Sequence, residues 1–257
     1  MINVKLMGKK GSRACKEIRS GAKILSYKGE SKTETNALIN YGLPKPNLDA
    51  FFRKFPSARK LPIINRHVGH SKYSVCLRAD KNKIPVPESK LSLDKKDDIS
   101  EWIEKRINSI GGKGICLARG RKLISGKYYQ KFIDKRKYEL RIHTFMWIPK
   151  EQWRVQKRLG AVDEIAWNYK NGGHFVSVYN PRSYKTFVQA MDISEEVLKM
   201  LGMSFGAVDF LVDRSNNVYF IEINSAPGFT ELSKPIYVDA FLKLKSLSHK
   251  ELLKFAK

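Results

Sequence analysis

The sequence has little cysteine and no long apolar run. Its 257 residues include three cysteines, which lie far apart and form no Cys-x-x-Cys pair, a pattern that argues against a disulfide framework or a zinc site. We expect Cys15, Cys76 and Cys116 to be reduced thiols of a cytoplasmic protein. No apolar run approaches the roughly 20 residues of a transmembrane helix, and the N-terminal residues lack the apolar core of a secretory signal.

Acidic residues are also scarce, since 25 of them face 49 basic residues and the formal net charge is +24. A field of this sign attracts polyanions such as nucleotides, nucleic acids and acidic peptides. We therefore expect an anionic substrate or partner, with solubility as the alternative explanation of the charge. Nucleic acid is a candidate partner, although the sequence carries no RRM, KH, zinc-finger or basic-zipper signature.

Two common catalytic patterns are missing from the sequence as well. The glycine turn at residues 8–12 is not a P-loop, because GxxxxGK[ST] does not occur. There is no Ser/His/Asp or Cys/His arrangement that would suggest a nucleophilic enzyme. With 42% apolar residues, the chain can nevertheless bury a substantial core, in one large domain or in two to three lobes.

A hairpin is predicted near the C-terminus, where a polar turn separates two apolar, strand-like runs. If the turn is centred on Ser215–Asn216, Asp209 lies opposite Glu222, and strand alternation places Asn224 on the face of Glu222. A slip of one residue would move the two acids to opposite faces, and a solvated hairpin with incidental acids is the alternative interpretation.

Facing carboxylates repel each other unless one is protonated or a cation lies between them. Mg²⁺ prefers oxygen ligands and is commonly held by one or two carboxylates together with substrate phosphates. Asn224 would add a neutral oxygen. The hairpin therefore predicts a magnesium site formed by Asp209, Glu222 and Asn224, which Mn²⁺ could also occupy.

The runs Val208-Asp209-Phe210 and Phe220-Ile221-Glu222-Ile223-Asn224-Ser225-Ala226-Pro227-Gly228 resemble the metal-binding end of the ATP-grasp carboxylate–amine ligases. That family includes D-alanine–D-alanine ligase and the glutamate ligases that extend ribosomal-protein tails. In it, the Asp, Glu and Asn hold two Mg²⁺ ions that bridge the ATP phosphates. The resemblance covers most of residues 61–233, with its motifs in family order. It implies an α+β ATP-grasp fold in which two lobes enclose ATP.

The resemblance and the sequence pattern together predict three parts. Residues 1–68 alternate strand-like and helix-like segments and form a small α/β domain. Residues 69–127 form the central ATP-grasp lobe with a glycine-rich loop, and residues 128–257 form the C-terminal lobe with the adenine hinge and the metal site. The helix that starts at Lys72 and the following Ile84-Pro85-Val86-Pro87 resemble the family's linker into the nucleotide-binding half.

The resemblance also implies a set of nucleotide-binding residues. Glycine-rich turns let backbone N–H groups approach phosphate oxygens closely. The implied residues are Lys72, the loop Gly111, Gly112, Lys113 and Gly114, the adenine hinge Gln130, Lys131, Phe132 and Ile133, and the acid Glu139. The family usually places a phosphate-binding Lys before this loop. Here Arg106 is the first candidate and Lys105 the second, within a segment, residues 97–108, whose pattern predicts a helix.

Three further residues are implied in catalysis, namely Arg141 of the acid-x-Arg pattern, Lys157 and Asn171. The implied reaction is ATP-dependent joining of a carboxylate and an amine through an acyl phosphate, with release of ADP and phosphate. Both substrates are unidentified, and an acidic peptide or protein is a candidate. Kinase-like phosphoryl transfer on the same fold and nucleic-acid binding on a degenerate nucleotide fold remain alternatives. His143 lies on the polar face with Arg141, where a structural role is the more frequent one.

Overall fold

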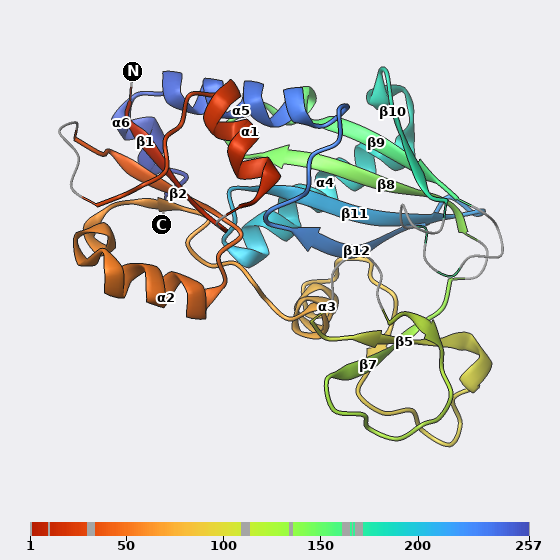
Figure 1. Cartoon of the computed structure of the whole chain (residues 1–257). Coiled ribbons are helices and arrows are strands. Elements are labelled where there is room, and N and C mark those ends of the chain that lie inside the picture. Colours follow the sequence, from red (N-terminus) through yellow and green to blue (C-terminus); the bar gives the residue numbers. More distant parts are fainter. Residues whose placement is uncertain are drawn as a thin grey trace.

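Three sheets organise the chain in the computed structural model, which describes residues 2–9, 11–29, 34–108, 114–133, 136–160, 165, 167 and 172–256 (Figure 1). The mixed helix and sheet content confirms the predicted α+β class. Within the described residues, no helix combines the length and the apolar character needed to cross a membrane.

The N-terminal residues form the predicted small α/β unit around a parallel sheet of order β1-β2-β3. Its elements are β1 (Val4–Gly8), α1 (Arg13–Gly21), β2 (Ala37–Tyr41), α2 (Lys45–Lys54), the 3-10 helix η1 (Pro56–Lys60) and β3 (Ile63–Ile64). All five residues of β2 are buried, which is typical of a central parallel strand with both faces covered. A single parallel bridge joins Leu6 of β1 to Ser26.

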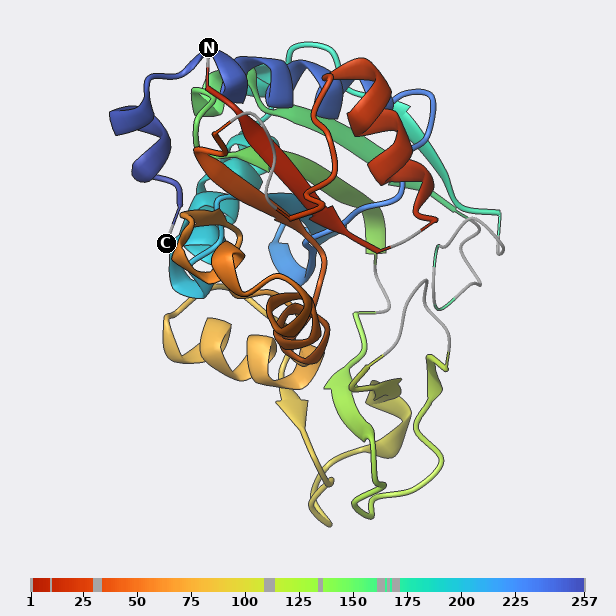
Figure 2. The same ribbon diagram turned by 60° about the vertical axis from the view of Figure 1, so that its left-hand side comes forward.

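The second sheet, of order β4-β7-β5-β6, forms a small lobe that stands apart from the other two (Figures 1 and 2). It comprises β4 (Ser89–Lys90), the 3-10 helix η2 (Ile99–Glu101), β5 (Trp102–Arg106), β6 (Cys116–Leu117) and β7 (Lys127–Lys131). The helix predicted over residues 97–108 is wrong. Pairing of β5 with both β6 and β7 and burial of Trp102 overrule the local helical pattern. The lobe's sheet also continues to Lys131, beyond the predicted domain boundary at residue 127.

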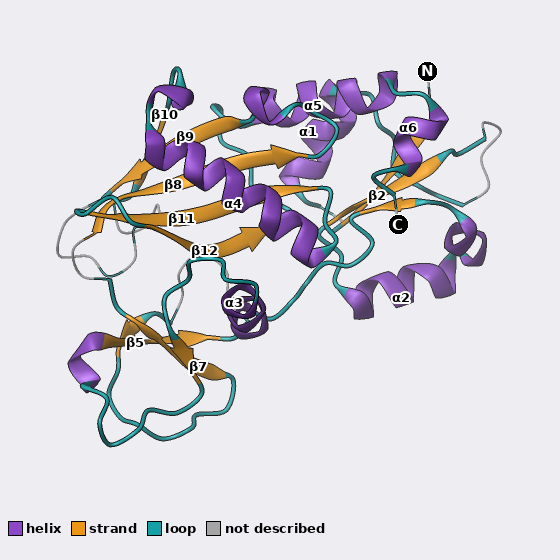
Figure 3. Cartoon of the chain, turned by 180° about the vertical axis from the view of Figure 1, so that it is seen from behind, coloured by secondary structure: helices purple, strands orange, loops and turns teal. Residues whose placement is uncertain are grey.

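The third sheet is antiparallel, of order β10-β9-β8-β11-β12, and is the largest. Its strands are β8 (Arg136–Phe145), β9 (Arg154–Leu159), β10 (His174–Ser177), β11 (Phe205–Asp213) and β12 (Val218–Asn224), with the 3-10 helices η3 (Lys150–Gln152) and η5 (Pro181–Ser183) between them. Helix α4 (Lys185–Leu201) covers one face, and α5 (Lys234–Ser246) covers part of the other (Figures 1 and 3). A short α6 (His249–Leu253) follows.

The two faces of this sheet differ in chemistry because side chains alternate along each strand. Leu140, Ile142, Val208 and Phe210 are buried in the main core, on the α4 side. On the other face, α5 covers His143, whose ring lies 5.4 Å from that of Tyr237. The part of this second face that α5 does not cover carries polar side chains such as Glu139, Arg141 and Asp209. These side chains line a cavity together with residues of the small lobe.

The N-terminal unit packs directly against the segment that follows β12. The ring of Tyr41 stacks on Phe205 at 6.0 Å between centroids, and its hydroxyl donates to the carbonyl oxygen of Pro227 at 2.8 Å. Gly42 has φ +78°, and a Cβ built there would lie 2.3 Å from the Cβ of Ala226. Only glycine fits this close approach without a shift of the chain.

Candidate functional site

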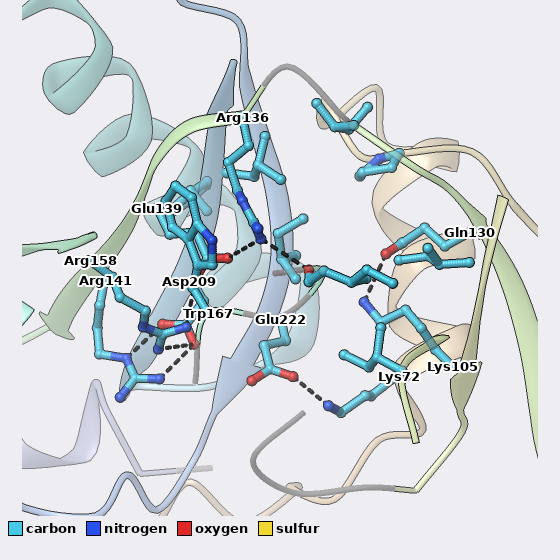
Figure 4. A pocket seen from close by; sticks show the side chains of 18 of the residues that line it. Lys72, Lys105, Gln130, Arg136, Glu139, Arg141, Arg158, Trp167, Asp209 and Glu222 are labelled. Carbon is cyan, nitrogen blue, oxygen red and sulfur yellow. Dashed lines mark hydrogen bonds and ion pairs between the residues drawn. The ribbon is translucent and has the colours of Figure 1, made fainter. Parts of the chain in front are cut away.

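A cavity of about 320 Å³ lies between the small lobe and the polar face of the large sheet (Figure 4). Its volume is at the lower end of the range of about 300–1,000 Å³ for small-molecule sites. The small lobe contributes β5, β7 and the segment after β7, while the large sheet contributes β8, β9, β11 and β12. The helix α3 (Lys72–Lys81), which links the N-terminal unit to the small lobe, adds its first residue.

The hairpin of β11 and β12 brings Asp209 opposite Glu222, as the sequence predicted. The turn itself differs from the prediction. Asn216 has φ +65° and its N–H donates to the carbonyl oxygen of Asp213 at 3.1 Å, which is the pattern of a three-residue loop. A register shift between Asp209 and Phe210, which leaves Ile221 as the extra residue of a β-bulge, restores the predicted pair.

The predicted metal ligands converge on the cavity. The amide nitrogen of Asn224 lies 3.2 Å from Glu222 Oε1 and 3.5 Å from Asp209 Oδ2. Two carboxylates and one amide supply oxygen ligands of the kind that Mg²⁺ prefers. Among the described residues no group of three or more His, Cys, Asp or Glu side chains could hold a metal, and Mg²⁺ commonly completes its coordination with water and substrate phosphates. The donor set therefore fits an ion shared with a phosphate.

Both carboxylates are paired with cations from other elements. Arg141 forms a bidentate pair with Asp209, with Nε–Oδ1 and Nη2–Oδ2 distances of 2.6 Å each. Lys72 Nζ lies 2.5 Å from Glu222 Oε2. Burial raises the pKa of Glu222, but the charge and hydrogen bond of Lys72, with help from Lys105 and Asn224, outweigh burial and lower this pKa to about 2. Glu222 is therefore ionised at neutral pH.

A second layer of arginines lies beside this pair on the same face. Arg158 Nη1 lies 2.6 Å from Glu139 Oε2, and Arg136 Nη1 lies 2.9 Å from Glu139 Oε1. Burial raises the pKa of Glu139, and the two arginines oppose that increase. The guanidinium carbons of Arg158 and Arg141 lie 4.4 Å and 4.9 Å from the centroid of Phe175, on the edge strand β10. One aromatic ring thus supports both arginines.

On the small-lobe side, Lys105 is buried and its Nζ donates to Gln130 Oε1 at 2.8 Å. Burial lowers the pKa of Lys105. Gln130 also donates to Ser89 Oγ at 3.1 Å, so its side chain is fixed. The predicted hinge residues Lys131, Phe132 and Ile133 line the cavity next to it. Among the described side chains, the hydrogen-bond partner of Lys105 is the neutral amide of Gln130, and Lys105 Nζ lies 5.9 Å from the centroid of Tyr128. The ammonium group of Lys105 lines the cavity, where it can contact an anionic ligand.

Other predicted residues lie elsewhere. Arg106 is exposed and lies outside the cavity lining, whereas its neighbour Lys105 lies inside. Lys157 lies on the α4 side of the sheet, where its Nζ is 4.5 Å from the centroid of Tyr138. Gly114 has φ +76° but does not line the cavity. Gly111, Gly112, Lys113 and Asn171 lie outside the described residues.

Several cavity residues had no assigned role in the sequence interpretation, namely Arg136, Arg158 and Trp167. The ring of Trp167 lies 3.8 Å from the guanidinium carbon of Arg136. Arg158 follows Lys157 directly and pairs with Glu139 of β8, but the sequence alone does not specify which of the two side chains faces the cavity. For Arg136 and Trp167 the sequence offers no local signal, because their contact joins distant segments.

His143 is buried and has a structural position. Its Nδ1 lies 3.1 Å from the hydroxyl of Tyr237, and its Nε2 lies 2.9 Å from Gln156 Oε1. Burial lowers the pKa of His143 to about 4, an effect that the Gln156 hydrogen bond opposes and the charge of Arg141 reinforces. The ring is therefore neutral at neutral pH and joins β8, β9 and α5.

We expect this buried ring to make the chain less stable in mild acid. Its pKa is about 4 in the folded chain, below the value of about 6.5 in an unfolded chain. Between these values the unfolded chain binds a proton that the folded chain does not, so the free energy of unfolding falls as pH falls. The loss attributable to His143 is about 2 kcal/mol between pH 7.5 and pH 5.

Urea unfolding of the wild type and of His143→Gln at both pH values measures this loss, because titrations of other groups are common to both proteins. The variant should lose less stability on acidification than the wild type does. Equal losses in the two proteins would contradict the assignment of His143 as a buried neutral ring.

Comparison with known proteins found one matching family model and similar solved structures. A family model described as D-ala D-ala ligase C-terminus matches residues 155–254. No curated protein sequence matches the chain significantly.

Solved structures are similar over nearly the whole chain. The ATP-grasp ligase PsnB complexed with a minimal precursor has a TM-score of 0.61 at 12% identity, covering 95% of this chain and 100% of that one. Macrocyclase MdnC from Microcystis aeruginosa MRC, bound with precursor peptide MdnA, has a TM-score of 0.59 at 13% identity, covering 96% and 100%. PsnB with a phosphomimetic precursor variant, Mg and ADP has a TM-score of 0.60 at 12% identity, covering 94% and 98%.

Proposed function

We propose that the chain, which has the ATP-grasp fold and whose residues 155–254 match a family model described as D-ala D-ala ligase C-terminus, is an ATP-dependent carboxylate–amine ligase. The reaction joins a carboxylate to an amine through an acyl phosphate. Its products are an amide, ADP and inorganic phosphate.

The observation that carries this proposal is the composition of a single cavity. One wall presents the facing carboxylates Asp209 and Glu222, and the opposite wall presents the buried cation Lys105 beside the Gln130 hinge. A nucleotide fits this arrangement, with its base against the apolar side chains of Phe132 and Ile133 and its phosphates directed toward Lys105 and the hairpin. The cavity offers phosphate-binding cations and metal ligands from opposite sides.

Asp209, Glu222 and Asn224 are the residues that would hold Mg²⁺, which supplies neutralisation of phosphate charge when bound. Arg141 and Arg158 stabilise the charge that develops on the transferred phosphoryl group. The substrate carboxylate oxygen attacks the γ-phosphorus and ADP leaves. The amine nitrogen then attacks the acyl carbon, phosphate leaves, and the amine proton is released. Neither step needs a nucleophile from the chain, which agrees with the absence of a nucleophilic motif in the sequence.

A peptide is the substrate class that the charge and the similar structures favour. PsnB and MdnC are both complexed with precursor peptides. The net charge of +24 would attract a peptide rich in Asp and Glu, whose side chains also supply the reacting carboxylate. We include this substrate class in the proposal.

ADP release in the presence of Mg²⁺ and ATP tests the reaction, with libraries of acidic peptides and of amines added separately and together. Release should require both substrates, and mass spectrometry should find a product equal to their sum less one water. A phosphorylated peptide without condensation would indicate a kinase instead. ADP release that is indifferent to every added pair would overturn the ligase assignment.

A further inference from the structure

The four oxygens of the predicted metal ligands Asp209 and Glu222 already have partners from the chain itself. Arg141 contacts both oxygens of Asp209, and Arg158 Nη2 is 3.8 Å from Oδ2. Lys72 contacts one oxygen of Glu222, and Asn224 donates to the other. Figure 4 shows the Arg141–Asp209 and Lys72–Glu222 pairs in the cavity. Within the described residues, each carboxylate therefore has a cationic partner.

These cations also line the cavity in which the phosphates would lie. The Arg141 and Lys72 side chains are 17% and 18% exposed, and those of Asp209 and Glu222 are 9% and 25% exposed. Screening by solvent is weak at such burial. A divalent ion bound to either carboxylate would lie next to a positive group unless that group moved away, and like charges this close repel strongly.

A polyphosphate offers both cations a new partner at the same place. Arginine and lysine bind phosphate oxygens as well as carboxylate oxygens. When they turn toward the phosphate, the carboxylates lose their counterions and attract a divalent cation. The exchange replaces two ion pairs by two others without leaving a buried charge unpaired, which would be costly.

We propose that Arg141 and Lys72 act as internal counterions of the metal ligands, so that divalent metal and nucleotide bind as a coupled pair and the metal alone binds weakly. This inference rests on the proposed function, since it assigns Asp209 and Glu222 to metal and the cavity to a nucleotide. It adds that the same two cations inhibit metal binding before the nucleotide arrives.

The distinguishing prediction is a gain of metal binding on removal of a cation. In the absence of nucleotide, Arg141→Met and Lys72→Met should each bind Mn²⁺ about 5- to 150-fold more tightly than the wild type, the usual range of a coupling factor. With a non-hydrolysable ATP analogue present, the same variants should bind the analogue more weakly, because a phosphate contact is lost. Free Mn²⁺ is measured by electron paramagnetic resonance, and analogue affinity by calorimetry.

Two controls locate the effect. Arg154→Met removes the same charge from an exposed position on β9, outside the cavity lining, and should leave Mn²⁺ affinity near the wild-type value. The double variant Lys72→Met/Glu222→Gln should not show the tighter Mn²⁺ binding of Lys72→Met, because the Glu222 carboxylate that would bind the ion is absent. Thermal unfolding of each variant verifies folding, and the two cations provide two independent tests.

The inference is overturned if neither Arg141→Met nor Lys72→Met binds nucleotide-free Mn²⁺ more tightly than the wild type, or if Arg154→Met gains as much. The proposed function fails differently. In that case, wild-type protein would bind no ATP analogue with Mn²⁺ present, whatever the single variants do with metal alone.

Discussion

Glu222→Gln should reduce ATP-dependent amide formation by at least about 100-fold. The substitution keeps the size of the side chain but removes the negative charge that pairs with Lys72 and that would attract the proposed metal ion. It also leaves Lys72 Nζ, now 2.5 Å from Glu222 Oε2, without an anionic partner. Steady-state ADP release with saturating substrates measures the loss, and the same loss is expected for Asp209→Asn.

A matched control lies on the same hairpin. Asp213→Asn removes a carboxylate from the turn, where Asp213 accepts from Asn217, and should leave turnover close to that of the wild type. If Glu222→Gln retained a turnover like that of Asp213→Asn, the hairpin would not be the metal site. Circular dichroism and thermal unfolding of all three variants exclude a folding defect as the cause.

Lys105→Met should weaken ATP binding and lower kcat/KM for ATP by roughly 100-fold, the scale for removal of one preorganised charge stabiliser. The side chain is buried and donates to Gln130, so its loss removes both the cation that we propose to face the phosphates and the hydrogen bond that fixes the side chain of Gln130. Methionine fills a similar volume without charge. Calorimetry with an ATP analogue separates binding from turnover.

Arg106→Met tests the neighbouring position with the same loss of charge. Arg106 belongs to the same strand but is exposed and lies outside the cavity lining, so its substitution should have a much smaller effect on kcat/KM. The reverse result, with the larger loss at Arg106, would show that the first candidate taken from the sequence is the phosphate ligand.

Strand parity separates these two residues. In the predicted helix, adjacent residues diverge by about 100°, and both could point toward one site. In β5 the cross-strand pairing with β7 places Lys105 and Arg106 on opposite faces. The same parity on β9 places Arg158 at the cavity and Lys157 on the α4 side. Parity depends on the partner strand, which a single sequence does not specify.

The predicted pairing of Asp209 with Glu222 is confirmed, although the hairpin differs from the predicted one in two ways. The two differences cancel in the strand register. The loop contains one residue more than the two-residue turn assumed, and the bulge at Ile221 supplies one more on β12. Had either occurred alone, Glu222 would have faced the core side of the sheet. Motif order was thus sufficient to predict the fold and the acids. The arginine layer around Glu139 was not predictable in full, since Trp167 joins it through tertiary packing.

The close approach of Gly42 to Ala226 connects the N-terminal unit to the candidate site. None of the described residues of this unit lines the cavity, but the unit contacts the segment that follows β12. The chain passes from Asn224 to Phe229 against the surface formed by Tyr41 and Gly42, so this surface positions Asn224, the last of the three predicted metal ligands. Deletion of the first 68 residues should therefore abolish the activity of the remaining chain. Gly42→Ala should lower the activity in part, because the added Cβ would displace Ala226 and with it the segment after Asn224.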